Sequence, residues 1–115
     1  TDEQKTGTGE VTLQEVTYTS TGAPATVTFS AMVKAYNIGF GGNAIGTLKI
    51  YRGTTLLHTY DGVINMPYNQ TTTIGFTIQD TPSAGSVNYI VKGTSTSNNG
   101  HGYTLRSLSV LEVKK

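Results

Sequence analysis

The chain has 115 residues, which is long enough for one domain with its own core. Its net charge is +1, and only 13% of its residues are charged. Its eight lysines and arginines form no basic stripe, and no apolar run reaches the length of a membrane-spanning helix, so we expect neither nucleic-acid binding nor membrane insertion. No cysteine is present, which excludes a disulfide framework. Threonine fills about one position in five and favours pleated strands over helices.

The first nine residues are polar and rich in glycine and threonine, so residues 1–9 are predicted to be a flexible lead-in or tether. Residues 10–115 then form a single domain. Alternation of apolar and polar residues divides that domain into strands. The predicted strands are 10–19, 25–36, 46–51, 55–60, 71–80, 86–93 and 102–114.

The strand at 25–36 has the cleanest alternation, with valine, phenylalanine and alanine on one face and mostly threonine and serine on the other. In the strand before it the apolar phase slips at Gln14 and Glu15, which predicts a β-bulge. The whole pattern predicts an all-β protein, an antiparallel β-sandwich of jelly-roll type with about seven to eight strands.

A glycine-rich stretch, Gly39-Phe40-Gly41 followed by Ala44, imitates a dinucleotide-binding loop. That chemistry needs a helix after the glycines, because the helix N-terminus holds the pyrophosphate. Here the segment leads into an alternating strand at 46–51. We therefore interpret it as a loop between strands and expect no cofactor.

If successive strands are antiparallel, alternate connections leave the sandwich at the same end. One end then receives short turns at 20–24, 52–54 and 81–85, and the other receives longer loops at 37–45, 61–70 and 94–101. Binding residues concentrate on loops that a rigid scaffold presents, although long loops at an outer tip also simply tolerate variation. The candidate ligand contacts at this long-loop end are Asn37, Phe40, Asn43, Asn65, Tyr68, Asn69, Asn98, Asn99, His101 and Tyr103.

Tyrosine is the main supply of sugar-stacking surface, because the chain has seven tyrosines and no tryptophan. Tyr68 and Tyr103 are the preferred ligand contacts. The tyrosines in or beside strands are expected to pack across strands instead: Tyr18, Tyr36, Tyr51, Tyr60 and Tyr89.

Catalysis is not expected, because the two histidines occur in no recognisable catalytic signature. His58 is placed on the surface of a strand and His101 in a loop. The carboxylates are spread over different strands and turns, and no cluster of metal ligands is evident. Asp61 and Asp80 are the only candidates for calcium, with the alternative that each simply begins a turn.

The C-terminal third carries a resemblance. A turn Asp-Thr-Pro-Ser-Ala-Gly at 80–85, a strand, an Asn/Gly loop and then Arg-Ser-Leu-Ser-Val-Leu-Glu-Val-Lys at 106–114 resemble the end of β-jelly-roll domains in bacteriophage fibre and other virion surface proteins, including receptor-binding and head-decoration proteins. The resemblance implies a homotrimer, contacts with other virion proteins, a place on the virion surface and attachment to host surface glycans.

Two other functions stay open: a free-standing carbohydrate-binding module or lectin, and a subunit of an extracellular filament in which residues 1–9 complete a neighbour's sheet. The last strand bears on the choice, because its apolar residues fall on both parities: Leu108 and Val110 on one, and Leu105, Leu111 and Val113 on the other. A second bulge and a buried subunit interface both explain this pattern. We expect a trimer contact to cover one face of the strand.

Overall fold

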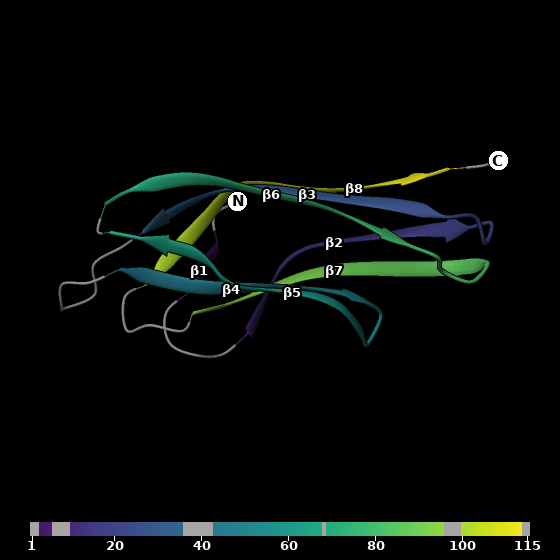
Figure 1. The fold of residues 1–115 in the computed structure, drawn as a ribbon, viewed down its shortest axis with the longest axis horizontal. Helices are drawn as coiled ribbons and strands as arrows, with labels where there is room; N and C mark the ends of the chain where they lie inside the picture. Colours follow the sequence, from purple (N-terminus) through teal and green to yellow (C-terminus); the bar gives the residue numbers. More distant parts are fainter. Residues whose placement is uncertain (1–2, 6–9, 36–42, 68, 96–99, 114–115) are drawn as a thin grey trace.

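The computed structural model describes residues 3–5, 10–35, 43–67, 69–95 and 100–113, and these contain strands but no helix. The strands are β1 (Glu3–Lys5), β2 (Glu10–Ser20), β3 (Ala25–Ala35), β4 (Ala44–Arg52), β5 (Thr55–Met66), β6 (Thr71–Asp80), β7 (Gly85–Ser95) and β8 (His101–Glu112). They form two four-stranded sheets in two layers (Figure 1). Sheet A has the order β1-β8-β3-β6, and sheet B has the order β2-β7-β4-β5. The predicted all-β sandwich is confirmed.

The strand pairs are antiparallel and nested. β4 pairs with β5, β3 with β6, β2 with β7 and β1 with β8, as in one long hairpin. The hairpin is rolled up so that β3 also pairs with β8, and β4 with β7. This wrapping distributes eight strands over two packed sheets and produces the jelly roll.

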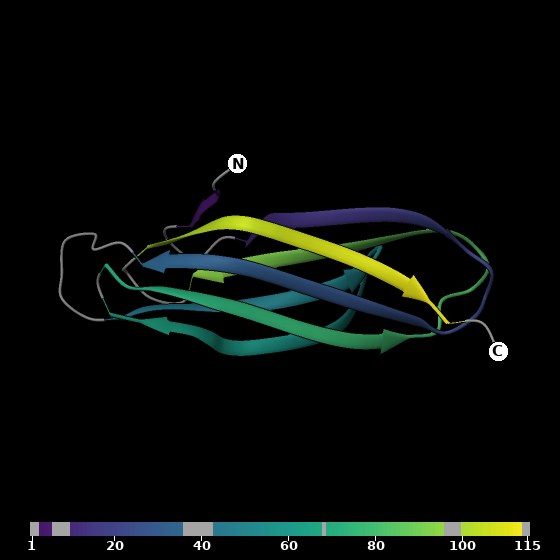
Figure 2. The same cartoon turned by 90° about the horizontal axis from the view of Figure 1, so that it is seen from above.

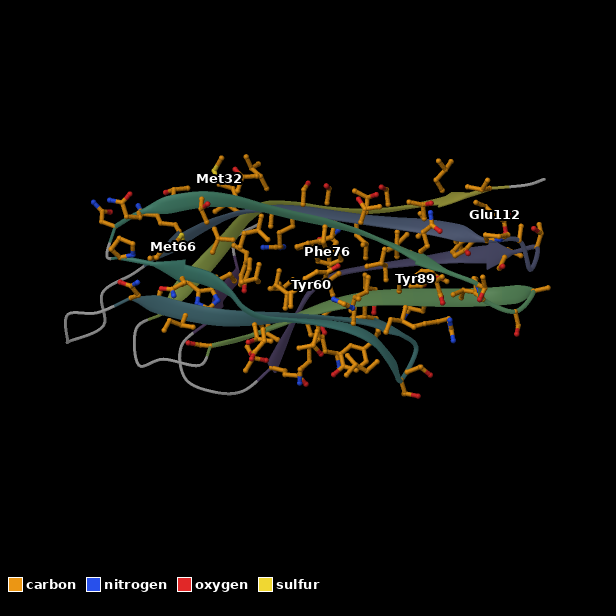
Figure 3. The ribbon with its side chains drawn as sticks, viewed as in Figure 1. Met32, Tyr60, Met66, Phe76, Tyr89 and Glu112 are labelled. Carbon is orange, nitrogen blue, oxygen red and sulfur yellow. The ribbon has the colours of Figure 1, made fainter. Side chains whose placement is uncertain are left out.

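The core lies between the sheets because the strands alternate as the sequence predicts. In β3 every second residue from Ala25 to Ala35 is buried, including Val27, Phe29 and Val33, and the residues between them face outward. Aromatic rings join the two layers, since Phe76 of sheet A lies 4.6 Å from Tyr60 of sheet B between ring centroids. Figure 3 shows both rings and Tyr89 between the sheets, whereas Met32 lies on the outer side of sheet A.

Two predicted boundaries are wrong. Residues 61–70 were expected to form a long loop, but β5 continues to Met66 and leaves only 67–70 as a connection. Residues 3–5, assigned to the lead-in, form the short strand β1 on β8 of the same chain. The remainder of the lead-in, residues 1–2 and 6–9, lies outside the described residues.

Both ends of the sandwich follow the predicted grouping of connections. The strands β3, β5 and β7 end on the left in Figure 1, and β2, β4 and β6 run the other way (Figure 2 gives the view from above). The extra strand β1 precedes all the others, so it leaves this alternation unchanged. The predicted bulge in β2 is also present, as a register shift between Thr12 and Gln14.

Candidate functional site

Only half of the predicted long-loop contacts can be placed. Asn43 and Asn65 are both exposed and come together, with the Asn43 amide donating a hydrogen bond to the Asn65 side-chain oxygen at 2.6 Å. Asn69 is exposed in the β5–β6 connection, with a φ of 62°. The predicted contacts outside the described residues are Asn37, Phe40, Tyr68, Asn98 and Asn99.

The prediction that His101 and Tyr103 contact a ligand is wrong, because both side chains are fully buried and neither presents a surface to a ligand. They point into the sandwich from β8, and His101 Nε2 lies 2.9 Å from Tyr103 Oη in a hydrogen bond. Burial raises the pKa of the Tyr103 phenol. Sheet B leaves room for the pair with glycines, since a Cβ on Gly46 would meet His101 and a Cβ on Gly93 would meet Tyr103. These residues belong to the core at the long-loop end.

A hollow of about 440 Å³ opens instead on the outer face of sheet B. It lies over β4, β5 and β7 and contains Asp61, one of the two residues considered for calcium. Thr94 is the last residue but one of β7, so the hollow reaches close to the long-loop end. Its lining is polar and carries one positive and one negative side chain: Thr47, Lys49, Thr59, Asp61 and Thr94.

A large β-bulge shapes this hollow. Gly46 pairs with Ile64 and Leu48 with Tyr60, so Thr47 alone opposes three residues of β5, 61–63. The Thr47 hydroxyl donates to Asp61 Oδ1 at 2.9 Å and accepts the Gly62 N–H at 3.2 Å. Gly62 takes a φ of 61°, in the left-handed region that glycine enters without a steric penalty.

One lining residue of the hollow, Lys49, has a second lysine beside it on the neighbouring strand. Lys49 of β4 and Lys92 of β7 are register partners and stand on the same outer face. Lys92 Nζ lies 4.9 Å from the centre of the Tyr51 ring, which also faces outward and is only half-buried. Tyr51 therefore contributes to this surface as well as to strand packing. Like charges directly opposite each other on neighbouring strands are destabilising.

The outer face of sheet A carries an apolar patch along β8 and β3. The exposed fractions are 76% for Leu105, 67% for Leu111, 43% for Val113 and 37% for Met32. We call these four residues the β8 patch. Leu108 and Val110, by contrast, pack against the core. The last strand thus has one core face and one apolar outer face.

β8 also contains a bulge where it pairs with β3. The register with β3 shifts between Ser30 and Met32, where Leu105 and Arg106 have no partner of their own. Leu105 has a φ of 48°, an unusual conformation for a bulky side chain. The Arg106 guanidinium donates to the Tyr103 carbonyl at 2.9 Å. Of the two explanations considered for the last strand, the bulge is therefore present, and the apolar outer face is exposed in the single chain.

Small hydroxyls cover much of the remaining outer face of sheet A. Ser30 and Ser107 are hydrogen bonded at 2.9 Å between β3 and β8, and Thr28 and Thr77 at 3.4 Å between β3 and β6. These small side chains occupy the face between the two ends of the β8 patch, and Lys34 is a charged residue beside Met32.

Asp80 anchors the opposite end of the sandwich. Its carboxylate accepts hydrogen bonds from Arg52 Nη1 at 2.5 and 2.6 Å and from Tyr89 Oη at 2.6 Å. Burial alone would disfavour the charge, but the hydrogen bonds from Arg52, Tyr89 and the Thr81 amide outweigh it and lower the pKa of Asp80. Burial, reinforced by Asp80, raises the pKa of Tyr89. Asp80 thus has an arginine and a tyrosine as partners and ties sheet A to sheet B, which removes the calcium interpretation for it.

The remaining candidates for chemistry lie apart from one another. His58 is exposed, as predicted, with its ring 4.4 Å from that of Tyr60. Asp61 sits in the β5 bulge rather than at the start of a turn. Among the described residues, no group of three or more histidine, aspartate or glutamate side chains is arranged to hold a metal ion. The described part of the chain has no helix long and apolar enough to cross a membrane.

No protein-family model and no curated protein matches the sequence. Solved structures share the fold at low identity. A structure of infectious bursal disease virus Gx strain matches with a TM-score of 0.60 and 13% identity, over 96% of this chain and 29% of that chain. The T13 viral particle of the same virus matches with a TM-score of 0.52 and 9% identity, over 96% and 32%.

A cyclase from Fischerella sp. TAU, solved in complex with 4-(1H-indol-3-yl)butan-2-one, matches with a TM-score of 0.58 and 14% identity, over 92% of this chain and 57% of that chain. The present chain therefore spans about a third or less of the two viral chains and somewhat more than half of the cyclase. At such identities the similarity shows a common fold.

Proposed function

We propose that this chain is a non-enzymatic structural domain of a virion, of the fibre or head-decoration kind, that assembles as a homotrimer on the particle surface. Its jelly roll, shared with chains in viral particles, supports the viral setting. The C-terminal resemblance to bacteriophage fibre and virion surface domains supports the trimer and the contact with other virion proteins.

The observation that carries the proposal is the β8 patch. Large exposed apolar side chains are typical of protein interfaces, and here Leu105 with Met32 and Leu111 with Val113 lie at two ends of a stretch of small hydroxyls that allows a second surface to approach closely. Leu105 adds a specific argument, because its left-handed φ costs free energy that glycine would not. A leucine that is both strained and 76% exposed does not stabilise the isolated domain. Contact with another copy of the chain would bury its side chain.

The viral setting is tested on particles from the organism that encodes the chain. Particles purified through a density gradient are digested and analysed by quantitative mass spectrometry. The proposal expects peptides of this chain at a fixed ratio to the major coat protein. Intact particles without these peptides would contradict it.

Attachment to a host surface glycan is the second part of the proposed function. Asn43, Asn65 and Asn69 remain proposed contacts at the long-loop end, together with the loop residues outside the described part of the chain. The polar hollow on sheet B favours an alternative with the same chemistry, a free-standing carbohydrate-binding module. Sugar binding by a stable monomer would favour that alternative over the virion domain.

A further inference from the structure

The hollow on sheet B is open, polar and large enough for a small molecule. Its volume of about 440 Å³ falls within the usual range of ligand pockets. All five lining residues belong to strands, so the sandwich itself fixes their backbones. The three-residue bulge at 61–63 is not needed to pair β4 with β5, and bulges commonly re-aim side chains next to functional sites.

The lining offers the hydrogen bonds that a saccharide needs. The hydroxyls of Thr59 and Thr94 can each donate and accept, as sugar hydroxyls do, whereas the buried Thr47 hydroxyl already donates to Asp61 and accepts from Gly62. Asp61 uses Oδ1 to accept from Thr47, and a carboxylate has further lone pairs for donors. The Asp61 side of the hollow is thus suited to bind sugar hydroxyls.

The opposite side is suited to bind an anion. Lys49 and Lys92 face each other across β4 and β7, and neither has an ion-pair partner among the described residues. Two negative side chains lie on β2, next to β7. Glu15 accepts a hydrogen bond from Asn88 at 3.3 Å, and Glu10 is exposed opposite Thr94. A bound anion between the two lysines would relieve their mutual repulsion.

The surroundings of Tyr51 favour an acidic sugar over a neutral one as the ligand. Neutral sugars bind mainly by stacking on an open aromatic face, but Lys92 lies over a face of this ring. With Lys92 over it, the ring does not present that face to a sugar. Charge, more than stacking, is what this surface offers a ligand.

We infer that the hollow beside Lys49 and Asp61 binds an acidic saccharide, with its carboxylate or sulfate at Lys49, where Lys92 on the neighbouring strand adds positive charge, and its hydroxyls at Asp61, Thr59 and Thr94. The inference rests on the attachment part of the proposed function, because it names the ligand class and moves the site from the loop end to the face of sheet B.

The test is isothermal titration calorimetry of the whole chain at low ionic strength with three tetrasaccharides: one containing glucuronic acid, one sulfated and one neutral. We expect an acidic tetrasaccharide to bind and the neutral one not to bind, and the better of the two acidic ligands identifies the anion. Lys49→Thr should weaken binding by about tenfold or more, since a charge-assisted hydrogen bond is lost. Lys34→Thr, on the outer face of sheet A, is the matched control and should bind as the wild type does.

The inference would be overturned if neither acidic ligand bound, or if the neutral ligand bound equally well. It would also be overturned if Lys49→Thr and Lys34→Thr weakened binding equally, because that would indicate unspecific charge attraction. Circular dichroism of each variant confirms that the fold is intact. Light scattering on the same samples separates the two proposals. Assembly without acidic-sugar binding contradicts the hollow alone, and sugar binding by a monomer contradicts the trimeric virion domain alone.

Discussion

His101 Nε2 and Tyr103 Oη lie 2.9 Å apart in the core at the long-loop end, in space left open by two glycines of the opposite sheet. An added Cβ on Gly46 would lie 2.7 Å from His101 Cε1, and one on Gly93 would lie 2.9 Å from Tyr103 Oη. Neither glycine has a positive φ. Close approach of the two sheets, not turn geometry, is therefore the reason for glycine at these positions.

Alanine at either glycine should destabilise the fold. We expect Gly46→Ala and Gly93→Ala each to lower the free energy of unfolding by about 1–3 kcal/mol, the usual cost of overpacking a core. Gly75→Ala is the control, because its Cβ would come no closer than 3.4 Å to a neighbour and its φ is not positive. Urea unfolding measures all three. Equal stability of Gly46→Ala, Gly93→Ala and the control would show that the sheets do not pack as closely as described.

Asp80 should dominate the acid side of the stability profile. Because its pKa is lowered in the folded chain, its contribution is complete above the ordinary value of 3.8 and is lost as the pH falls through the lower folded value. Asp80→Asn should cost about 1.5–3 kcal/mol at neutral pH, since hydrogen bonds to a charged group are lost. It should also flatten the decline in stability below about pH 4.

Urea unfolding between neutral and strongly acidic pH checks the Asp80 prediction. Glu10→Gln changes an exposed carboxylate outside the Arg52–Asp80–Tyr89 cluster and serves as the control. If Asp80→Asn kept the acid decline of the wild type, the cluster would not be its source.

Two buried phenols, those of Tyr89 and Tyr103, should determine how the stability of the fold changes at alkaline pH. Burial raises the pKa of Tyr89 and Tyr103 above the ordinary 10.0, so their contribution to stability is complete below that pH and is lost as the pH rises through the folded values. We expect some of the seven tyrosines to ionise only when the near-ultraviolet circular dichroism signal of the fold disappears.

Ultraviolet absorbance of tyrosinate, recorded together with circular dichroism, follows this titration. Tyr103→Phe should reduce the late-ionising fraction and cost about 1 kcal/mol at neutral pH through the lost hydrogen bond to His101. Tyr51→Phe, on the outer face of sheet B, should leave that fraction unchanged. Ionisation of every tyrosine in a fully native protein would contradict the prediction.

Alternation predicted most of the fold because each long strand buries one face. The strand at 25–36 was found at Ala25–Ala35, and its inward residues are the buried ones. Alternation failed where something other than burial forms the strand. β1 is a polar tripeptide that exists only through pairing with β8, and the second half of β5 was missed because the bulge at 61–63 interrupts its period.

The candidate sites were less predictable, because they depend on pairing between distant strands. Lys49 and Lys92 become neighbours only when β4 lies beside β7, and no local pattern indicates that pairing. His101 follows a polar loop and for that reason was assigned to the surface. The available signal was glycine inside strands, at Gly46 and Gly93, which indicates close approach of another group without naming it.

Leu105 offers the most direct test of the β8 patch, because its backbone conformation favours glycine whereas the patch needs its apolar side chain. Leu105→Gly should leave the fold intact and relieve strain of about 1 kcal/mol, while removing the most exposed apolar side chain of the patch. Leu56→Ser changes another exposed leucine, on β5 of sheet B, and is the matched control. Thermal unfolding of dilute samples checks the fold of both variants.

The measurement that tests self-association most directly is the solution mass of the wild type, Leu105→Gly and Leu56→Ser by light scattering over a dilution series. We predict a mass about three times 12.2 kDa for the wild type and Leu56→Ser, and a shift toward 12.2 kDa for Leu105→Gly. A wild type that stays at 12.2 kDa at every concentration, or a Leu105→Gly variant that associates as the wild type does, would contradict assembly through the β8 patch.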